Sequence, residues 1–273
     1  MIVAAVCGVA LLFIAKANAQ DVKQGVVTIV RMHGDATFTT DGGSTWQPLM
    51  LGAVLHSGAV IKTAPDATVD IVLGEKVAQV AQGGGAGMNN AGAYAAGLPP
   101  ASSGFKAAVQ QNVIRMMGGT ELAVDKLTYS NSGAETVGDT ELDLRSGKIF
   151  GNVKKISAMS KYEIKTPTGV AGIRGTDFAL GADGSVICTD GSVVVSAMVS
   201  IGGVQTLVTV TVNAGEIFDP STYSPSAPVQ DVGVDNATVA AALAVSEGLA
   251  TSYNTEANGQ AAQNSTTTVY VSP

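Results

Sequence analysis

Short runs rich in Val, Ile and Thr, separated by clusters of Gly, Asp and Ser, fill most of this 273-residue sequence after its first twenty residues. Within the runs, apolar and polar residues alternate with a period of two rather than 3.6, which is the pattern of half-buried strands. The clearest runs are 26–32, 36–40, 59–63, 68–73, 121–128, 142–150, 162–166 and 204–212. The sequence therefore predicts an all-β fold, either a sandwich or a short solenoid-like stack of antiparallel strands.

The composition narrows the classes of function. Charged residues make up 14% of the chain, well below the usual ~25%, while 46% are hydrophobic, so the chain can bury a core. The net charge of -7 disfavours nucleic acid and anionic membrane surfaces as partners. Two His and two Cys, far apart in the sequence, are too few for a zinc or iron–sulfur framework or a disulfide scaffold. We expect no metal and no cofactor.

The first nineteen residues resemble an export signal. Residues 1–15 are almost wholly apolar and uncharged, and Ala17, Asn18 and Ala19 form a small-residue cleavage pattern before Gln20. The basic residues that usually begin a signal peptide are missing, and an uncleaved anchor is the alternative. We expect cleavage after Ala19, export to the periplasm or outer surface of a bacterium, and no transmembrane helix in the mature chain.

Two Asp-Gly pairs, at 183–184 and 190–191, predict tight turns in the segment 177–199. We expect three strands in a meander, with Val186, Cys188, Val193 and Val195 in the core and Ser185, Thr189 and Ser192 facing solvent. Cys188 is the one cysteine of the mature chain. We expect a buried, unreactive thiol there, with an intermolecular disulfide as the alternative.

Two segments differ in composition from the β region. Residues 78–112 are rich in Gly, Ala, Asn and Ser and lack the strand, helix and Lys of a phosphate-binding loop, which predicts a mobile insertion able to carry a binding function. Residues 220–273 form a Pro- and Ala-rich extension. There Asp235 or Asn236 can cap a weakly packed short helix reaching about Ala250. A flexible tail follows, whose residues 265–272 have strand propensity.

The sequence IKTPTGVAGIRGTDFAL at 164–180 resembles the core signature of FecR-like domains, the extracytoplasmic β domains of ferric-citrate-type regulators. Similar stretches are GDATFTTDGGSTWQPLMLGAVLHSGAVIKTAPDATVDIVL at 34–73, LDLRSGKIF before the signature and DGSVICTDGSVVVSA after it. The resemblance covers about 25–219, and we assign 20–219 to one FecR-like β domain. Its motif residues are Trp46, Gly52, Gly58, Thr63, Thr166, Pro167, Gly169, Gly172, Arg174, Gly175, Thr176 and Phe178.

Several motif residues have predictable structural roles. Pro167 ends a strand because it lacks an amide proton, and the three glycines that follow it permit a sharp re-entry into a new strand. For Arg174 we expect a partly buried clamp on Asp177 or Glu141, with ligand capture as the alternative. For Trp46 we expect a core position rather than a platform for a sugar.

A catalytic site has few candidate residues. His33 and His56 are the only imidazoles, and both fall in turns, where histidines are usually solvated. Asp139, Glu141 and Asp143 alternate on one strand and so share a face. The row could bind calcium or serve acid–base chemistry, but we favour a solvated face whose like charges discourage edge pairing. We therefore expect no enzyme.

FecR-like domains resemble one another as sensing or docking modules that relay a receptor signal to a sigma factor. Because no cytoplasmic segment precedes the apolar run, we do not expect sigma-factor control by this polypeptide alone. The resemblance implies an exported, non-enzymatic module that docks on another envelope or surface protein. The alternative is a structural subunit of an extracellular assembly, a homo-oligomer joined by addition of the strand at 265–272 to a neighbour's open sheet.

Overall fold

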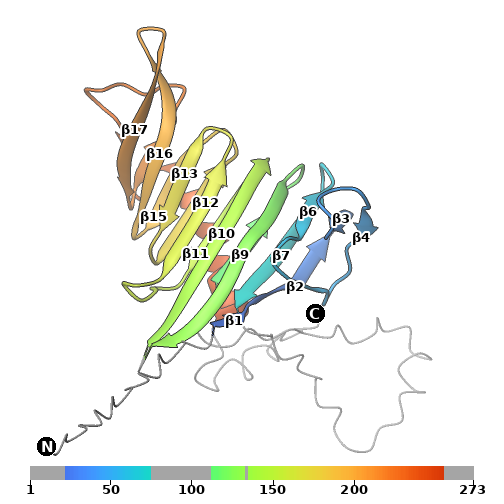
Figure 1. The fold of residues 1–273 in the computed structure, drawn as a ribbon. Helices are drawn as coiled ribbons and strands as arrows, with labels where there is room; N and C mark the ends of the chain where they lie inside the picture. The colour runs from blue at the N-terminus through green and yellow to red at the C-terminus, as the bar shows by residue number, and fades with distance from the viewer. Residues whose placement is uncertain (1–21, 75–111, 133–134, 255–273) are drawn as a thin grey trace, which may run out of the picture.

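Two stacked β-sheets and one helix make up the computed structural model, which describes residues 22–74, 112–132 and 135–254 (Figure 1). The all-β prediction is confirmed, with the short helix near the C-terminus. The predicted signal peptide at 1–19, the insertion at 78–112 except Asn112, and the tail with its strand at 265–272 lie outside the described residues. Asn112 begins a strand.

The first sheet has ten strands. Along the sheet they follow the order β17-β16-β13-β12-β10-β9-β6-β3-β4, and β1 pairs with β9 beside this path. Their bounds are β1 Val22–Gln24, β3 Ala36–Thr39, β4 Gln47–Pro48, β6 Val60–Thr63, β9 Glu121–Ser132, β10 Glu135–Ser146, β12 Lys161–Thr166, β13 Gly169–Ile173, β16 Ser192–Ile201 and β17 Val204–Asn213.

The second sheet has nine strands, in the order β19-β18-β15-β14-β11-β8-β7-β2-β5. Their bounds are β2 Val26–His33, β5 Val54–Leu55, β7 Thr68–Gly74, β8 Asn112–Met116, β11 Lys148–Val153, β14 Thr176–Gly181, β15 Val186–Asp190, β18 Glu216–Phe218 and β19 Gln230–Asp231. The helix α2 spans Ala237–Asn254.

The chain alternates between the sheets as it advances. Strands early in the sequence lie at one end of both sheets and late strands at the other, so the fold is a sandwich laid down as a stack. The pairings are antiparallel except that of β10 with β12, among the described strands. The two forms left open by the sequence, sandwich and stack, are therefore two descriptions of this one fold.

The core lies between the sheets because successive side chains of a strand point to opposite faces. In β16, Val193 and Val195 are buried while Val194 and Met198 are exposed. The largest fully buried side chains come from both sheets, as sandwich packing requires. They include Phe178, Phe218, Ile29, Ile61, Ile71, Leu122, Leu142 and Leu144.

The predicted three-strand meander is wrong in its second half. β14 and β15 form the expected hairpin, but β16 pairs with β13 in the other sheet, so Asp190-Gly191 is a crossing between sheets. Cys188, Val186, Val193 and Val195 are buried as predicted. Thr189 is buried rather than solvated, because its face of the nine-stranded sheet lies under α2.

The helix begins where its capping residue predicts. The N–H of Thr238 donates to Asn236 Oδ1 at 2.9 Å, which identifies Asn236 as the N-cap. The helix runs four residues past Ala250 and packs on β8, β11, β14 and β15. Val239 and Leu249 are fully buried, a closer contact than the Ala-rich sequence predicts. No helix among the described residues has both the length and the apolar character needed to cross a lipid bilayer.

Candidate interaction surface

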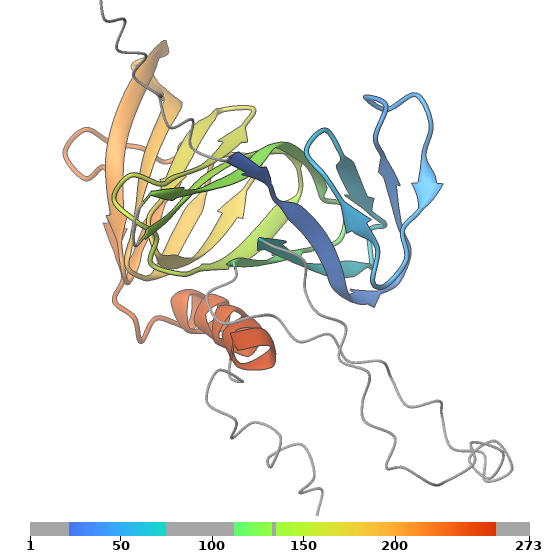
Figure 2. The ribbon, with the colours of Figure 1, turned by 60° about the horizontal axis from the view of Figure 1, so that its bottom comes forward.

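The two sheets differ in what covers their outer faces. The helix α2 packs on strands β8, β11, β14 and β15 of the nine-stranded sheet, and no described element lies over the outer face of the ten-stranded sheet (Figure 2). A sheet that is antiparallel for most of its width can leave one face to solvent. This uncovered face is therefore a regular surface of the described structure that is available to a partner.

One part of this surface, which we call the charged face, consists of outward side chains on β6, β9, β10 and β12. The row of Asp139, Glu141 and Asp143 runs along its centre, as the alternation predicts. Each acid contacts a cation: Asp139 contacts Lys126, Glu141 contacts Lys161 at 2.9 Å, and Asp143 contacts Arg145 at 2.9 Å. Further ion pairs are Lys161–Glu163, Lys165–Asp125, Lys165–Glu141, Arg145–Glu121 and Lys62–Glu121.

This arrangement corrects the role expected for the acidic row. β10 lies between β9 and β12 in the interior of the sheet, so its acids do not protect an edge. Cations on the same face offset their like charges. Within the described ranges there is no cluster of three His, Cys, Asp or Glu arranged to hold a metal ion.

The ion pairs shift the pKa values of four groups on this face so that the charged form of each is favoured. The hydrogen bond from Lys161 lowers the pKa of Glu141, and the same bond raises the pKa of Lys161. The bond to Asp125 raises the pKa of Lys165, and that to Asp143 raises the pKa of Arg145. Glu141, Arg145, Lys161 and Lys165 therefore stay ionised near neutral pH, and the charged face keeps both signs of charge.

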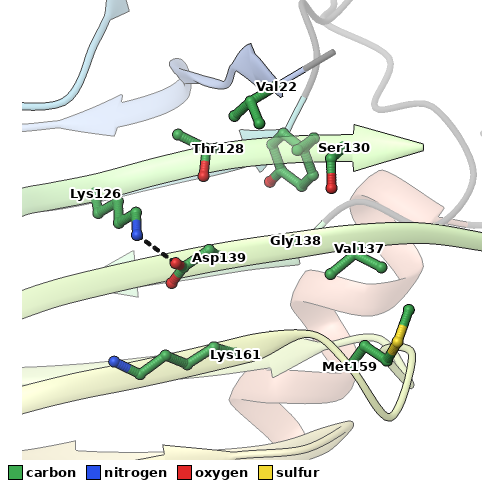
Figure 3. A pocket seen from close by; sticks show the side chains of 10 residues that line it. Val22, Lys126, Thr128, Ser130, Val137, Gly138, Asp139, Met159 and Lys161 are labelled. Atoms are coloured by element: carbon green, nitrogen blue, oxygen red, sulfur yellow. Dashed lines mark hydrogen bonds and ion pairs between the residues drawn. The ribbon is translucent and has the colours of Figure 1, made fainter. Parts of the chain in front are cut away.

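A shallow hollow of about 330 Å³ opens on the charged face beside β1 (Figure 3). Its lining comes from β1, β9, β10, β12 and the loop before β12, and Gly138 contributes no side chain. Figure 3 shows the Lys126–Asp139 pair and Lys161 along one side and Val137 and Met159 toward the other. The hollow therefore presents charged and apolar groups together.

The second part, which we call the neutral face, consists of outward side chains on β13, β16 and β17. None of the residues in these three strands is charged. Val194, Met198 and Leu207 are exposed there among Ser and Thr side chains, and Met198 pairs directly with Leu207. Exposed apolar groups bounded by polar ones are typical of interaction sites.

The motif threonines join the two sheets. Thr63 is buried at the end of β6, where its Oγ1 donates to the carbonyl of Met117 at 2.6 Å and accepts from the N–H of Thr120. Thr176 is buried at the start of β14 and donates to the carbonyl of Ser192 at 2.9 Å. Both side chains satisfy backbone groups at crossings, so these motif residues have structural roles.

The predicted bend after Pro167 is a two-residue hairpin between β12 and β13. Pro167 follows the last residue of β12, as predicted, and Thr166 Oγ1 accepts the N–H of Gly169 at 3.1 Å. A Cβ on Gly169 would lie 2.0 Å from the carbonyl oxygen of Ser196, so β16 approaches too closely for any side chain. Gly175 has φ +79° at the next crossing.

The other motif glycines and Phe178 also have definable places. Gly172 lies within β13 with no close contact, so nothing in its surroundings requires glycine. Gly52 and Gly58 have positive φ, and their N–H groups donate to the carbonyls of Ile29 and Val124. Phe178 is buried in the core, with its ring against Gly151.

Two predicted structural roles are wrong. Arg174 is exposed rather than clamped: Asp177 accepts a hydrogen bond from Asn152, and Glu141 pairs with Lys161. The turn leaves Arg174 exposed at the surface. Trp46 is 38% exposed rather than in the core, because it precedes the short edge strand β4; the Lys62 Nζ lies 5.9 Å from its ring centroid.

The candidate nucleophile, Cys188, is buried, whereas the two candidate bases, His33 and His56, are at the surface. Cys188 is completely buried, and burial together with nearby acids raises its pKa to about 12, as expected for an unreactive thiol. His33 and His56 are both exposed, as predicted, and neither contacts Cys188 in the described structure.

The sequence did not reveal the surface as a whole. The alternation of Lys161, Glu163 and Lys165 indicates a charged strand face. The parallel pairing of β10 with β12, which sets Glu141 beside that face, has no signal in the sequence because the chain crosses to the other sheet between them.

Comparison with known families identifies part of this structure. Residues 107–194 match the family described as FecR protein. The match covers less than half of the chain, so this segment is similar to a FecR domain. The matched segment includes most of the charged face and the start of β16, and the resemblance predicted from the signature at 164–180 is confirmed over this range.

Solved structures give a partial likeness. Two crystal structures, each of an anti-sigma factor candidate from Parabacteroides distasonis ATCC 8503, share 16% identity with this chain. The first gives a TM-score of 0.32 over 49% of this chain and 57% of its own, and the second 0.33 over 53% and 67%. This chain thus spans little more than half of the first. No curated protein sequence matches it.

Proposed function

We propose that this chain is an exported, non-enzymatic FecR module that takes part in signal transduction by docking on another envelope protein. The observation that supports this function is the uncovered face of the ten-stranded sheet, since α2 covers only the opposite sheet. The FecR family match supports the regulatory role. The leader at 1–19 supports export to the periplasm or cell surface.

The charged face is the docking surface that best suits this role. Its acids and cations alternate over neighbouring strands, and their side chains are partly exposed. Paired surface charges contribute little to folding stability, so they are free to select a partner of complementary pattern. The hollow beside β1 adds the apolar groups Val137 and Met159, which a partner can cover.

Site-specific photo-crosslinking in the producing cells tests the docking proposal. A photoreactive residue replacing Glu163, on the charged face, should crosslink to one defined envelope protein. The matched control replaces Ala244, which is exposed on α2 and faces away from the sheets. The Glu163 adduct should weaken at high salt, because exposed ion pairs are screened. Equal crosslinking from both positions, or none from Glu163, would contradict docking on this face.

Export is tested separately. The protein recovered from the periplasm or medium should begin at Gln20 by amino-terminal sequencing. Recovery of the unprocessed chain from the cytosol would exclude an envelope function whatever the crosslinking shows.

A second function, as a subunit of an extracellular assembly, is favoured by one observation: β17 is a long strand at the open end of its sheet. Such an edge can accept an added strand, and residues 265–272 of a neighbour have the required propensity. Deletion of 265–273 should then abolish assembly in size-exclusion chromatography. An unchanged elution volume would remove this alternative.

A further inference from the structure

The four ends of the two sheets are protected unequally. The ten-stranded sheet ends in β4 and β17, and the nine-stranded sheet ends in β5 and β19. β4, β5 and β19 have two residues each, and β4 contains Pro48, whereas β17 has ten residues. Very short strands and proline are common ways of preventing edge pairing. Three ends are therefore closed to another strand, and the end at β17 is open.

The hydrogen-bonding groups of β17 alternate between its partner and the open side. Ile201 and Val204 pair across the two-residue turn at Gly202-Gly203, so the even-numbered residues of β17 bond to β16. The outward groups belong to Gln205, Leu207, Thr209 and Thr211. The next residue in this series, Asn213, confirms the phase, because its N–H donates to Glu216 Oε2 at 2.6 Å.

Nothing in the sequence of β17 resists the approach of another strand. The strand reads VQTLVTVTVN, without charge or proline, and is rich in Val and Thr. No described strand pairs with it on the side away from β16. The β16–β17 hairpin also projects past the ends of the neighbouring strands (Figure 1). Long, uncharged, exposed edges of this kind are sites of strand addition.

We propose that β17 pairs antiparallel with β17 of a second copy of this chain, joining two ten-stranded sheets into one. A two-fold axis perpendicular to the sheet keeps the outer faces of both copies on the same side. With the axis at Leu207, which is 65% exposed, that side chain meets its counterpart, while Met198, 42% exposed and beside it on β16, lies one strand further from the axis.

The distribution of charge also favours a second copy of this chain at the β17 edge. The whole chain carries a net charge of -7, so two copies repel over most orientations. The three strands β13, β16 and β17 are free of charge, and the edge at β17 is where two copies can meet without opposing like charges. Because the other three sheet ends are short, the pairing closes at a dimer rather than continuing into a fibre.

The size of the contact sets its strength. A single strand pair buries less than the roughly 1,200–2,000 Å² of a stable interface, so we expect a concentration-dependent equilibrium rather than a permanent dimer. This inference goes beyond the docking function and does not depend on it, since the charged face stays uncovered in the dimer. Pairing of β17 with a second β17 and addition of a neighbour's residues 265–272 would use the same edge, so one excludes the other.

Sedimentation equilibrium of the purified full-length protein tests the proposal. The mass should rise with concentration from that of the monomer toward twice that value. L207K places like charges beside the two-fold axis. T209P removes an outward N–H and spares the backbone hydrogen bonds to β16, although it also loses the hydroxyl hydrogen bond between Thr209 and Ser196. Each should weaken dimerisation about tenfold or more. M198K introduces the same charge one strand further from the edge and should change the dissociation constant of the dimer by less than about threefold.

The remaining outcomes decide against the proposal. Far-ultraviolet circular dichroism must first show that all three variants retain the β fold, and Q205K, nearer the hairpin tip, replaces L207K or T209P if either does not. A wild-type protein that stays monomeric at about 0.5 mM would overturn the inference. M198K acting as strongly as L207K would assign the contact to the sheet face. Loss of the dimer on deletion of 265–273 would assign the edge to the tail.

Discussion

The contact between Gly151 and Phe178 allows a quantitative test of the core. Gly151 lies in β11 opposite Phe178 of β14, and Phe178 belongs to the FecR signature. A Cβ on Gly151 would lie 2.4, 2.5 and 3.2 Å from Cζ, Cε1 and Cε2 of the ring. Phe178 is fully buried, so the ring cannot turn aside without displacing other core groups. We therefore predict that G151A destabilises the fold by overpacking, by about 1–3 kcal/mol.

The same distances predict a rescue. Leu lacks the three ring atoms that the new Cβ would meet, so F178L removes the clash at the cost of a small cavity, about 1–2 kcal/mol by itself. In the double variant the Ala methyl group fills part of that cavity. The loss of stability in G151A/F178L should then be smaller than the sum of the two single losses by about 1–2 kcal/mol.

Urea unfolding at 25 °C, followed by far-ultraviolet circular dichroism, measures these differences from the transition midpoint at constant slope. The matched control is G172A, because Gly172 is also a mid-strand glycine but its Cβ would meet only the carbonyl of Val194, at 3.7 Å. We expect this control to change stability by less than about 0.5 kcal/mol. Additive losses in the double variant, or equal losses for G151A and G172A, would refute the packing argument.

Three further predictions follow from single contacts. G169A should separate β13 from β16 and cost more than about 2 kcal/mol, since its Cβ meets the backbone oxygen of Ser196; urea unfolding measures this, and an unchanged midpoint would contradict it. N236A removes the cap that accepts the Thr238 N–H and should cost about 1 kcal/mol, with faster amide exchange confined to α2. The pKa of Cys188, raised to about 12, predicts stability that is full below the unfolded thiol's pKa of about 8.5 and is lost as pH rises toward 12. C188A should show a smaller loss of urea midpoint between pH 8 and pH 10.5 than the wild-type protein, and parallel curves would exclude the thiol as the cause.

The local features of this protein could be predicted from the sequence. Alternation with a period of two placed Val186, Cys188 and Val193 in the core, because the direction of a strand side chain depends only on its position. The end of β12 at Pro167 and the helix cap at Asn236 followed from groups within a few residues of each other. The FecR signature identified the family for the same reason, since its residues lie close together in the chain.

The exposure of Arg174 and Trp46 could not be predicted in this way. Each depends on which sheet the neighbouring strand joins, and a turn at Gly175 or at the edge strand β4 gives no sign of that choice. Asp190-Gly191 illustrates the difference: the pair correctly predicts a tight turn, but the same turn can close a hairpin or carry the chain across to the other sheet.

The sequence by itself determined the strands, their inward and outward faces and the similarity of residues 107–194 to the FecR family. Only the tertiary structure decided that β10 lies beside β12, that α2 covers one sheet, and that β17 remains at an open end. The physical reason is the range of the forces. Side-chain alternation and turn geometry act within a few residues, whereas the order of strands in a sheet is fixed by burial of apolar surface between segments distant in the chain.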